Sequence, residues 1–179
     1  MTDETYLFYD TETTGTNTRY NIPLQYAAIR TNSDMKILEE IDIRCKLPMH
    51  IIPYPGALQV THTNPYDIAN NQYRLYEFAT IINKIQSQYN NTVFIGHNII
   101  KYDEEIIRSL MYMNLQYPFV STSRGNRRID TLELLQVMHT FAPGIINTNL
   151  NENGNHIFKL EQIAELNGFH GHNAHDALG

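Results

Sequence analysis

A short apolar run, Tyr6 to Asp10, leads directly into the polar segment Thr11 to Asn17. A run of this length that ends in a polar segment containing glycine is typical of a buried strand. Two more strand patterns follow after short connections, at Gln25 to Thr31 and at Ile37 to Cys45. Three successive strands with short links predict an antiparallel meander, which is the main constraint on the fold.

The rest of the chain alternates helical patterns with one more strand, which is typical of a mixed α/β domain. Its 179 residues fit a single domain. The expected elements are a loop over Lys46–Gly56, a helix from Asn64-Pro65, a helix over Leu75–Ile85, a strand over Thr92–Gly96, helices over Asp103–Met113, Asp130–His139 and Lys159–Leu166, and mostly loop over Thr140–Phe158.

Composition and charge limit the classes of function. The single cysteine, Cys45, alternates with apolar residues and is expected in the core, which suggests a reducing compartment. The chain shows neither an export signal nor an apolar run long enough to span a membrane, so we expect a cytoplasmic protein. A net charge of −6 argues against gripping nucleic acid by phosphate attraction alone. Phosphate chemistry would therefore need metal ions.

Two carboxylates, Asp10 and Glu12, stand two residues apart where the first strand ends. Residues at this spacing project from the same face of a strand, so the two side chains can share one metal ion. Oxygen ligands select hard cations such as Mg²⁺ or Mn²⁺. The alternative is a solvated loop that follows the strand.

Two further aspartates occur at the start of helical patterns. Asp103 begins a helix after the segment Gly96 to Tyr102, where an acid is also favoured simply by the helix dipole. Asp176 follows the histidine-rich segment Gly171 to His175. Zinc is the alternative there, but the segment lacks a matching cysteine and a compact His-x3-His spacing.

In order and separation, three motifs resemble those of the DEDD exonuclease superfamily, and the likeness covers essentially the whole chain. It is closest to the exonuclease I family, because further segments are also similar to that family. The motifs are Asp10-Thr11-Glu12, Gly96-His97-Asn98 followed by Asp103, and Asn173-Ala174-His175-Asp176-Ala177; the further segments are Gln25–Thr31, Pro55-Gly56-Ala57 and Asn167-Gly168.

The resemblance implies a ribonuclease H-like fold, a mixed sheet flanked by helices. It also implies two Mg²⁺ or Mn²⁺ ions, held by four carboxylates that take part in catalysis: Asp10, Glu12, Asp103 and Asp176. The segment Thr13, Thr14 and Gly15 would meet the terminal nucleotide, or else is only a polar turn. Tyr102 could stack on a base, or else is a core residue. The other tyrosines do not interleave with basic residues, and most are expected to pack inside.

The catalytic base is where the sequence departs from the family. The family's histidine usually lies five residues before the last metal-binding aspartate, where this chain has Gly171. His172 is the favoured base and His170 the alternative, because a loop can absorb a slip of one residue. His175 is interpreted as structural.

The function implied is that of a metal-dependent 3′→5′ exonuclease that acts on single-stranded DNA and releases 5′-mononucleotides. We expect a monomer whose partners are single-stranded DNA and a single-strand-binding protein. Residues 1–179 would form the exonuclease domain, without its last helix and any following domains. The alternatives are an inactive nuclease-like interaction domain and a related exonuclease that acts on short RNA.

Overall fold

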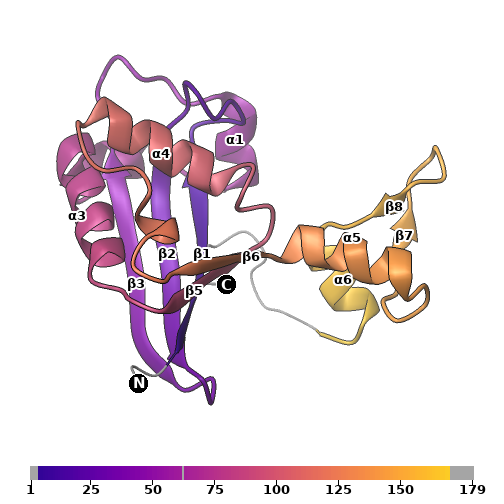
Figure 1. Cartoon of the computed structure of the whole chain (residues 1–179). Helices are drawn as coiled ribbons and strands as arrows, with labels where there is room; N and C mark the ends of the chain where they lie inside the picture. The colour runs from indigo at the N-terminus through magenta and orange to yellow at the C-terminus, as the bar shows by residue number, and fades with distance from the viewer. Residues whose placement is uncertain (1–3, 62, 170–179) are drawn as a thin grey trace.

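A six-stranded mixed sheet forms the centre of the molecule in the computed structural model, which describes residues 4–61 and 63–169 (Figure 1). The strands lie in the order β4-β3-β2-β1-β5-β6. Their bounds are β1 Thr5–Thr13, β2 Pro23–Asn32, β3 Ile37–Lys46, β4 Tyr73–Arg74, β5 Thr92–Gly96 and β6 Arg127–Asp130. The predicted mixed sheet is therefore confirmed.

Strands β1, β2 and β3 form the antiparallel meander that the sequence predicts. On its other side β1 pairs in parallel with β5, and β5 pairs in parallel with β6. The first strand was predicted to end at Asp10, and this was wrong. Strand β1 continues to Thr13 while it pairs with β2. The two acidic residues of the first motif thus lie on a strand rather than in a loop after it.

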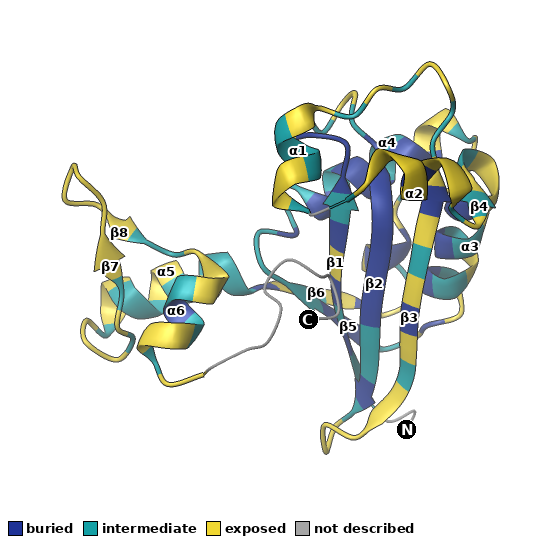
Figure 2. Cartoon of the chain, turned by 180° about the vertical axis from the view of Figure 1, so that it is seen from behind, coloured by how far each residue is buried: buried dark blue, intermediate teal, exposed yellow. Residues whose placement is uncertain are grey.

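Two long helices cover one face of the sheet, as Figures 1 and 2 show from opposite sides: α3, Leu75–Ser87, and α4, Asp103–Met113. Their apolar faces bury Phe78, Ile82 and Leu110 completely, against Tyr26 of β2 and Phe94 of β5. Both helices match their predicted positions. This core holds the strand ends that carry the candidate site.

Two short helices follow β3: α1, Pro55–Val60, and α2, Pro65–Asn70. The predicted cap of α2 is confirmed, because the Asn64 side chain accepts a hydrogen bond from the N–H of Tyr66. The expected loop over Lys46–Gly56 is confirmed except at its edges, since Lys46 belongs to β3 and α1 begins at Pro55.

After β6 the chain leaves the sheet and forms a separate lobe (Figure 1). Its elements are α5, Thr131–Phe141, β7, Asn149–Leu150, β8, His156–Ile157, and α6, Leu160–Leu166. The expected loop over Thr140–Phe158 is therefore interrupted by the β7–β8 hairpin. Only a few residues form this hairpin, too few for an alternating pattern to be read from the sequence.

Cys45 is completely buried, as predicted, and burial raises the pKa of its thiol to about 12. The thiol therefore stays protonated and packs as a small apolar group. In the described part of the chain, no helix has the length and apolar character needed to cross a bilayer.

Candidate active site

The first two acidic residues lie on the part of β1 that extends beyond its parallel neighbour. Pairing between β1 and β5 ends at Phe8 and Ile95, whereas pairing with β2 continues through Asp10 and Glu12. These two residues alternate with Thr11, so their side chains share one face of the strand. The β5 side of this stretch is left open for another element.

That element is the loop that joins β5 to α4. It can pass close to β1 because residue 96 is glycine: a Cβ there would lie 2.7 Å from the carbonyl oxygen of Tyr9. Asp130 anchors the loop, because its carboxylate accepts hydrogen bonds from the N–H groups of Asn98, at 2.8 Å, and Ile100, at 3.1 Å. The loop therefore delivers the start of α4 to the open side of β1.

Asp103, the first residue of α4, points its carboxylate at β1. Its Oδ1 accepts two hydrogen bonds from Thr11, one from the backbone N–H at 3.0 Å and one from the hydroxyl at 2.6 Å. Asp103 is only 2% exposed, and burial together with the nearby charge of Asp10 raises its pKa to about 8. Asp10 lies at the surface, but the protein around its carboxylate removes enough water to raise its pKa too.

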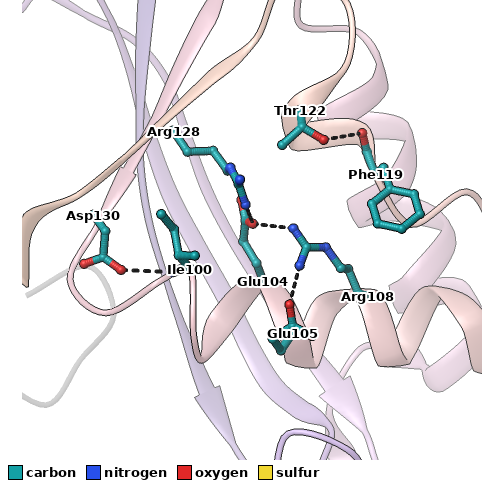
Figure 3. A network of polar contacts seen from close by, with 8 residues as sticks. All are labelled: Ile100, Glu104, Glu105, Arg108, Phe119, Thr122, Arg128 and Asp130. Atoms are coloured by element: carbon teal, nitrogen blue, oxygen red, sulfur yellow. Dashed lines mark hydrogen bonds and ion pairs between the residues drawn. The ribbon is translucent and has the colours of Figure 1, made fainter. Parts of the chain in front are cut away.

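The first turn of α4 is fixed by a buried acid (Figure 3). Glu104, 3% exposed, pairs with Arg128 of β6 and, at 2.7 Å, with Arg108 one turn along the helix. Arg108 also pairs with the more exposed Glu105. These pairs tie the helix start to the edge of the sheet, so the adjacent Asp103 has little freedom to move.

Tyr102 joins the loop to the turn that follows β1. Its half-buried hydroxyl lies 2.6 Å from the hydroxyl of Thr13 and donates to the carbonyl oxygen of Gly15 at 3.0 Å. Burial raises the pKa of Tyr102, and the charges of Asp103, Glu12 and Asp10 add to the rise. All three carboxylates therefore lie within electrostatic reach of one phenol.

Thr14 organises the same turn from inside. It is completely buried, and its hydroxyl accepts hydrogen bonds from the N–H of Ile22 and the side chain of Asn21. The predicted segment Thr13, Thr14 and Gly15 is thus an ordered turn beside the carboxylates. The Thr14 hydroxyl is used for hydrogen bonds within the protein. Contact of Thr13 and Gly15 with the terminal nucleotide stays a prediction.

His97 connects the site to the lobe that holds α5 and α6. Its ring nitrogens lie 3.1 Å from the hydroxyl of Thr131 and 2.8 Å from the carbonyl oxygen of Phe158. Burial lowers the pKa of His97. The neutral ring therefore acts as a link between the β5 end and the lobe.

The residues present suit a hard divalent cation, because three acidic side chains lie within electrostatic reach of Tyr102 and two of them, Asp10 and Asp103, have raised pKa values that a cation would lower. Within residues 4–61 and 63–169, no three His, Cys, Asp or Glu side chains are grouped closely enough to hold an ion alone. The fourth predicted ligand, Asp176, lies outside the described residues, as do His170, His172 and His175.

Three residues that support this site were not predicted from the sequence: Thr11, Glu104 and Asp130. Thr11 stands between the two acids of the first motif, and Asp130 is the N-cap of α5, where its side chain accepts from Leu132. A capping signal was therefore visible at Asp130. No local signal marks the buried pairing of Glu104, since its partner Arg128 is 24 residues away.

A separate apolar cavity of about 530 Å³ lies between α5 and α6. Leu134, Leu135, Ile145 and Ile163 are among its lining residues, and no carboxylate is. This cavity lacks acidic groups, so the carboxylates at the end of β1 remain the candidate active site.

A family model of exonucleases, the RNase T family, matches residues 7–179. The chain belongs to this exonuclease family. Exodeoxyribonuclease I of Escherichia coli K12 is 32% identical over 176 residues, which is 97% of this chain and 37% of that protein. Exodeoxyribonuclease I of Haemophilus influenzae is 35% identical over 178 residues, which is 98% of this chain and 37% of that protein. The exonuclease chain thus spans less than two fifths of the length of these relatives.

Solved structures agree with this exonuclease assignment. The crystal structure of Escherichia coli exonuclease I in complex with a dT13 oligonucleotide matches with a TM-score of 0.89 and 32% identity, covering 98% of this chain and 38% of that one. A complex titled ExoI/SSB-Ct matches with a TM-score of 0.89 and 30% identity, covering 98% and 38%. The predicted ribonuclease H-like fold and the resemblance to exonuclease I are therefore confirmed.

Proposed function

We propose that this chain is the catalytic domain of a metal-dependent 3′→5′ exonuclease that removes 5′-mononucleotides from single-stranded DNA. The observation that carries the proposal is the buried Asp103 carboxylate, which is delivered to Asp10 across the open side of β1. Without a cation, the negative charges of Asp10 and Asp103 repel each other. Because the chain belongs to an exonuclease family, we assign these acids to phosphodiester hydrolysis.

Asp10, Glu12, Asp103 and Asp176 would hold two Mg²⁺ or Mn²⁺ ions. When bound, such ions lower the pKa of an attacking water and offset the charge on the departing oxygen. Thr11 keeps the Asp103 carboxylate aimed at the site. Thr13 and Gly15, with Tyr102, would position the terminal nucleotide, and the buried Thr14 would support their turn from inside. His172, with His170 as the alternative, would take the proton from the attacking water, so that its imidazole becomes protonated as the phosphodiester bond breaks.

Single-stranded DNA is the proposed substrate because the related Escherichia coli exonuclease I has been solved with a dT13 oligonucleotide. A single-strand-binding protein is a proposed partner because another related structure is titled ExoI/SSB-Ct. We propose a monomeric protein whose binding of DNA is weak, since a net charge of −6 supplies little attraction for phosphates.

The test is a nuclease assay on a single strand labelled at its 5′ end, with Mg²⁺ or with a chelator. We expect a ladder that shortens from the 3′ end, 5′-mononucleotides as product, no reaction with chelator, and slower reaction on a blunt duplex. Asp103→Asn is the inactive control. Shortening from the 5′ end, undiminished activity in chelator, or equal rates on single strands of RNA would each contradict part of the proposal.

A further inference from the structure

The tyrosines are distributed differently from the sequence prediction, since many lie at the surface. The exposed ones are Tyr20, Tyr54, Tyr66, Tyr76, Tyr112 and Tyr117. Tyr54 differs from the others in its attachment to the candidate site. Its backbone N–H donates to the carbonyl oxygen of Thr14 at 2.8 Å. The segment between β3 and α1 is thereby fastened to the turn that follows the two acids of β1.

The Tyr54 ring packs over the glycine two residues later. A Cβ on Gly56 would lie 2.7 Å from Cε1 of the ring, so the ring lies directly over the position that a side chain would fill. Gly56 is not one of the glycines that have a positive φ. Glycine at position 56 therefore makes room for the ring, not for an unusual backbone.

Tyr54 is 68% exposed although its backbone N–H is bonded to the turn. Two more large apolar side chains of the same segment, Met49 and Ile52, are also exposed. An aromatic side chain on an anchored backbone has few rotatable bonds to order when a flat ligand covers it. Nucleobases stack on such rings whatever their sequence, which an exonuclease requires of its subsites.

We propose that Tyr54 is a stacking platform for one base of the single strand, close to the nucleotide held at Thr13 to Gly15. This inference rests on the proposed function. In an acidic chain, contacts with bases must supply part of the affinity that phosphate contacts do not. Tyr102 is bonded to the same turn through Thr13 and Gly15, so the turn connects the carboxylates with the backbone of Tyr54.

The experiment measures equilibrium binding of a 5′-fluorescent oligodeoxyadenylate by anisotropy, in chelator at pH 7 so that no hydrolysis occurs. A single abasic residue is moved through the positions nearest the 3′ end. We expect one position to weaken binding by roughly 5- to 150-fold, the range that corresponds to ~1–3 kcal/mol per stacked base. In Tyr54→Ala, binding of the intact strand should be weaker by a similar factor, and the abasic residue at that position should cost nothing further.

Three variants complete the test. Tyr54→Phe should bind as the unsubstituted protein does, because stacking needs the ring and not the hydroxyl. Gly56→Ala should resemble Tyr54→Ala, because the new methyl group displaces the ring. Tyr76→Ala, which removes an exposed tyrosine on α3, should leave binding unchanged.

The outcomes separate this inference from the proposed function. The same abasic profile in the unsubstituted protein and in Tyr54→Ala would overturn the stacking role, as would the absence of measurable binding. Binding without nucleotide release in Mg²⁺ would overturn the proposed function alone. Melting followed by circular dichroism shows whether each variant is folded, and a ring so exposed should contribute little to stability.

Discussion

Thr11 donates two hydrogen bonds to a single oxygen of Asp103, one from its N–H and one from its hydroxyl, although the two residues are 92 positions apart. The pair lies where β1 has lost its parallel neighbour β5. The aspartate thus satisfies a strand N–H that has no partner on this side. The same contact fixes a buried carboxylate next to Asp10.

Thr11→Val tests the hydroxyl of this pair, because valine keeps the shape of the side chain and removes the donor. A hydrogen bond to a charged group contributes about 1.5–3 kcal/mol, so the charged form of Asp103 should become less favourable and Mn²⁺ should bind roughly 10- to 100-fold more weakly. Isothermal calorimetry measures the affinity. Thr11→Ser, which keeps the hydroxyl, is the control, and equal losses in both variants would contradict this role.

The raised pKa of Asp103 predicts how stability depends on pH in the metal-free protein. Its folded pKa of about 8 exceeds the ordinary 3.8. Between these pH values the folded protein holds a proton that the unfolded chain has released, so this carboxyl's contribution to stability falls as pH rises and is lost above about pH 8. Asp103→Asn removes this loss of stability at high pH, because the asparagine side chain does not ionise.

Urea denaturation in chelator checks this expectation at pH 5 and pH 9. At each pH the free energy of unfolding of Asp103→Asn is compared with that of the unsubstituted protein. This difference should favour the variant by at least ~1 kcal/mol more at pH 9 than at pH 5, since one unit of pKa shift corresponds to ~1.4 kcal/mol. Adding Mn²⁺ at pH 7 should stabilise the unsubstituted protein and not the variant. Asp67→Asn, at an exposed position of α2, should change neither result.

Tyr102→Phe tests the phenol that holds the turn after β1. The variant keeps the ring and loses the contacts with Thr13 and Gly15, each of which contributes ~0.5–1.5 kcal/mol. We expect kcat/KM to fall about 3- to 30-fold because the turn positions the terminal nucleotide less well. If Tyr102→Ala is no worse than Tyr102→Phe, the ring does not stack on a base.

Glu104→Ala tests the buried acid behind Asp103. Removing it leaves Arg108 and Arg128 without their shared partner, which should lower the free energy of unfolding by about 3 kcal/mol. This is the lower end of the range for buried pairs, because both arginines keep some contact with solvent. Glu105→Ala breaks only a more exposed pair and should cost less than ~1 kcal/mol in the same urea titration. Similar losses would contradict the special role of Glu104.

The base remains a prediction from the sequence, because His170 and His172 lie outside the described residues. His172→Ala should lower turnover by roughly 10²- to 10⁴-fold, the usual contribution of a positioned base, with Mn²⁺ affinity nearly unchanged. Activity should rise with pH through the pKa of the histidine, because the neutral imidazole accepts the proton. If His170→Ala removes the pH-dependent limb and His172→Ala does not, the base is His170.

The sequence by itself determined the longer elements around this site and three of its acidic positions. The meander β1-β2-β3, helix α3 and helix α4 could be predicted because apolar periodicity and capping are properties of neighbouring residues. The same reasoning placed Asp10 and Glu12 where the first strand ends, with side chains able to project on the same side, and Asp103 at the start of a helix. Motif order then gave the family.

Only the tertiary structure decided which residues support those acids. Thr11 donates to Asp103, and Glu104 pairs with Arg128. The backbone of Tyr54 donates to Thr14. These contacts form because the sheet and its loops bring distant segments together. Such contacts depend on strand order and register, which leave no periodic signal along the chain. The length of β1 was underestimated for the same reason: its polar end is held by pairing with β2, not by its own apolar character.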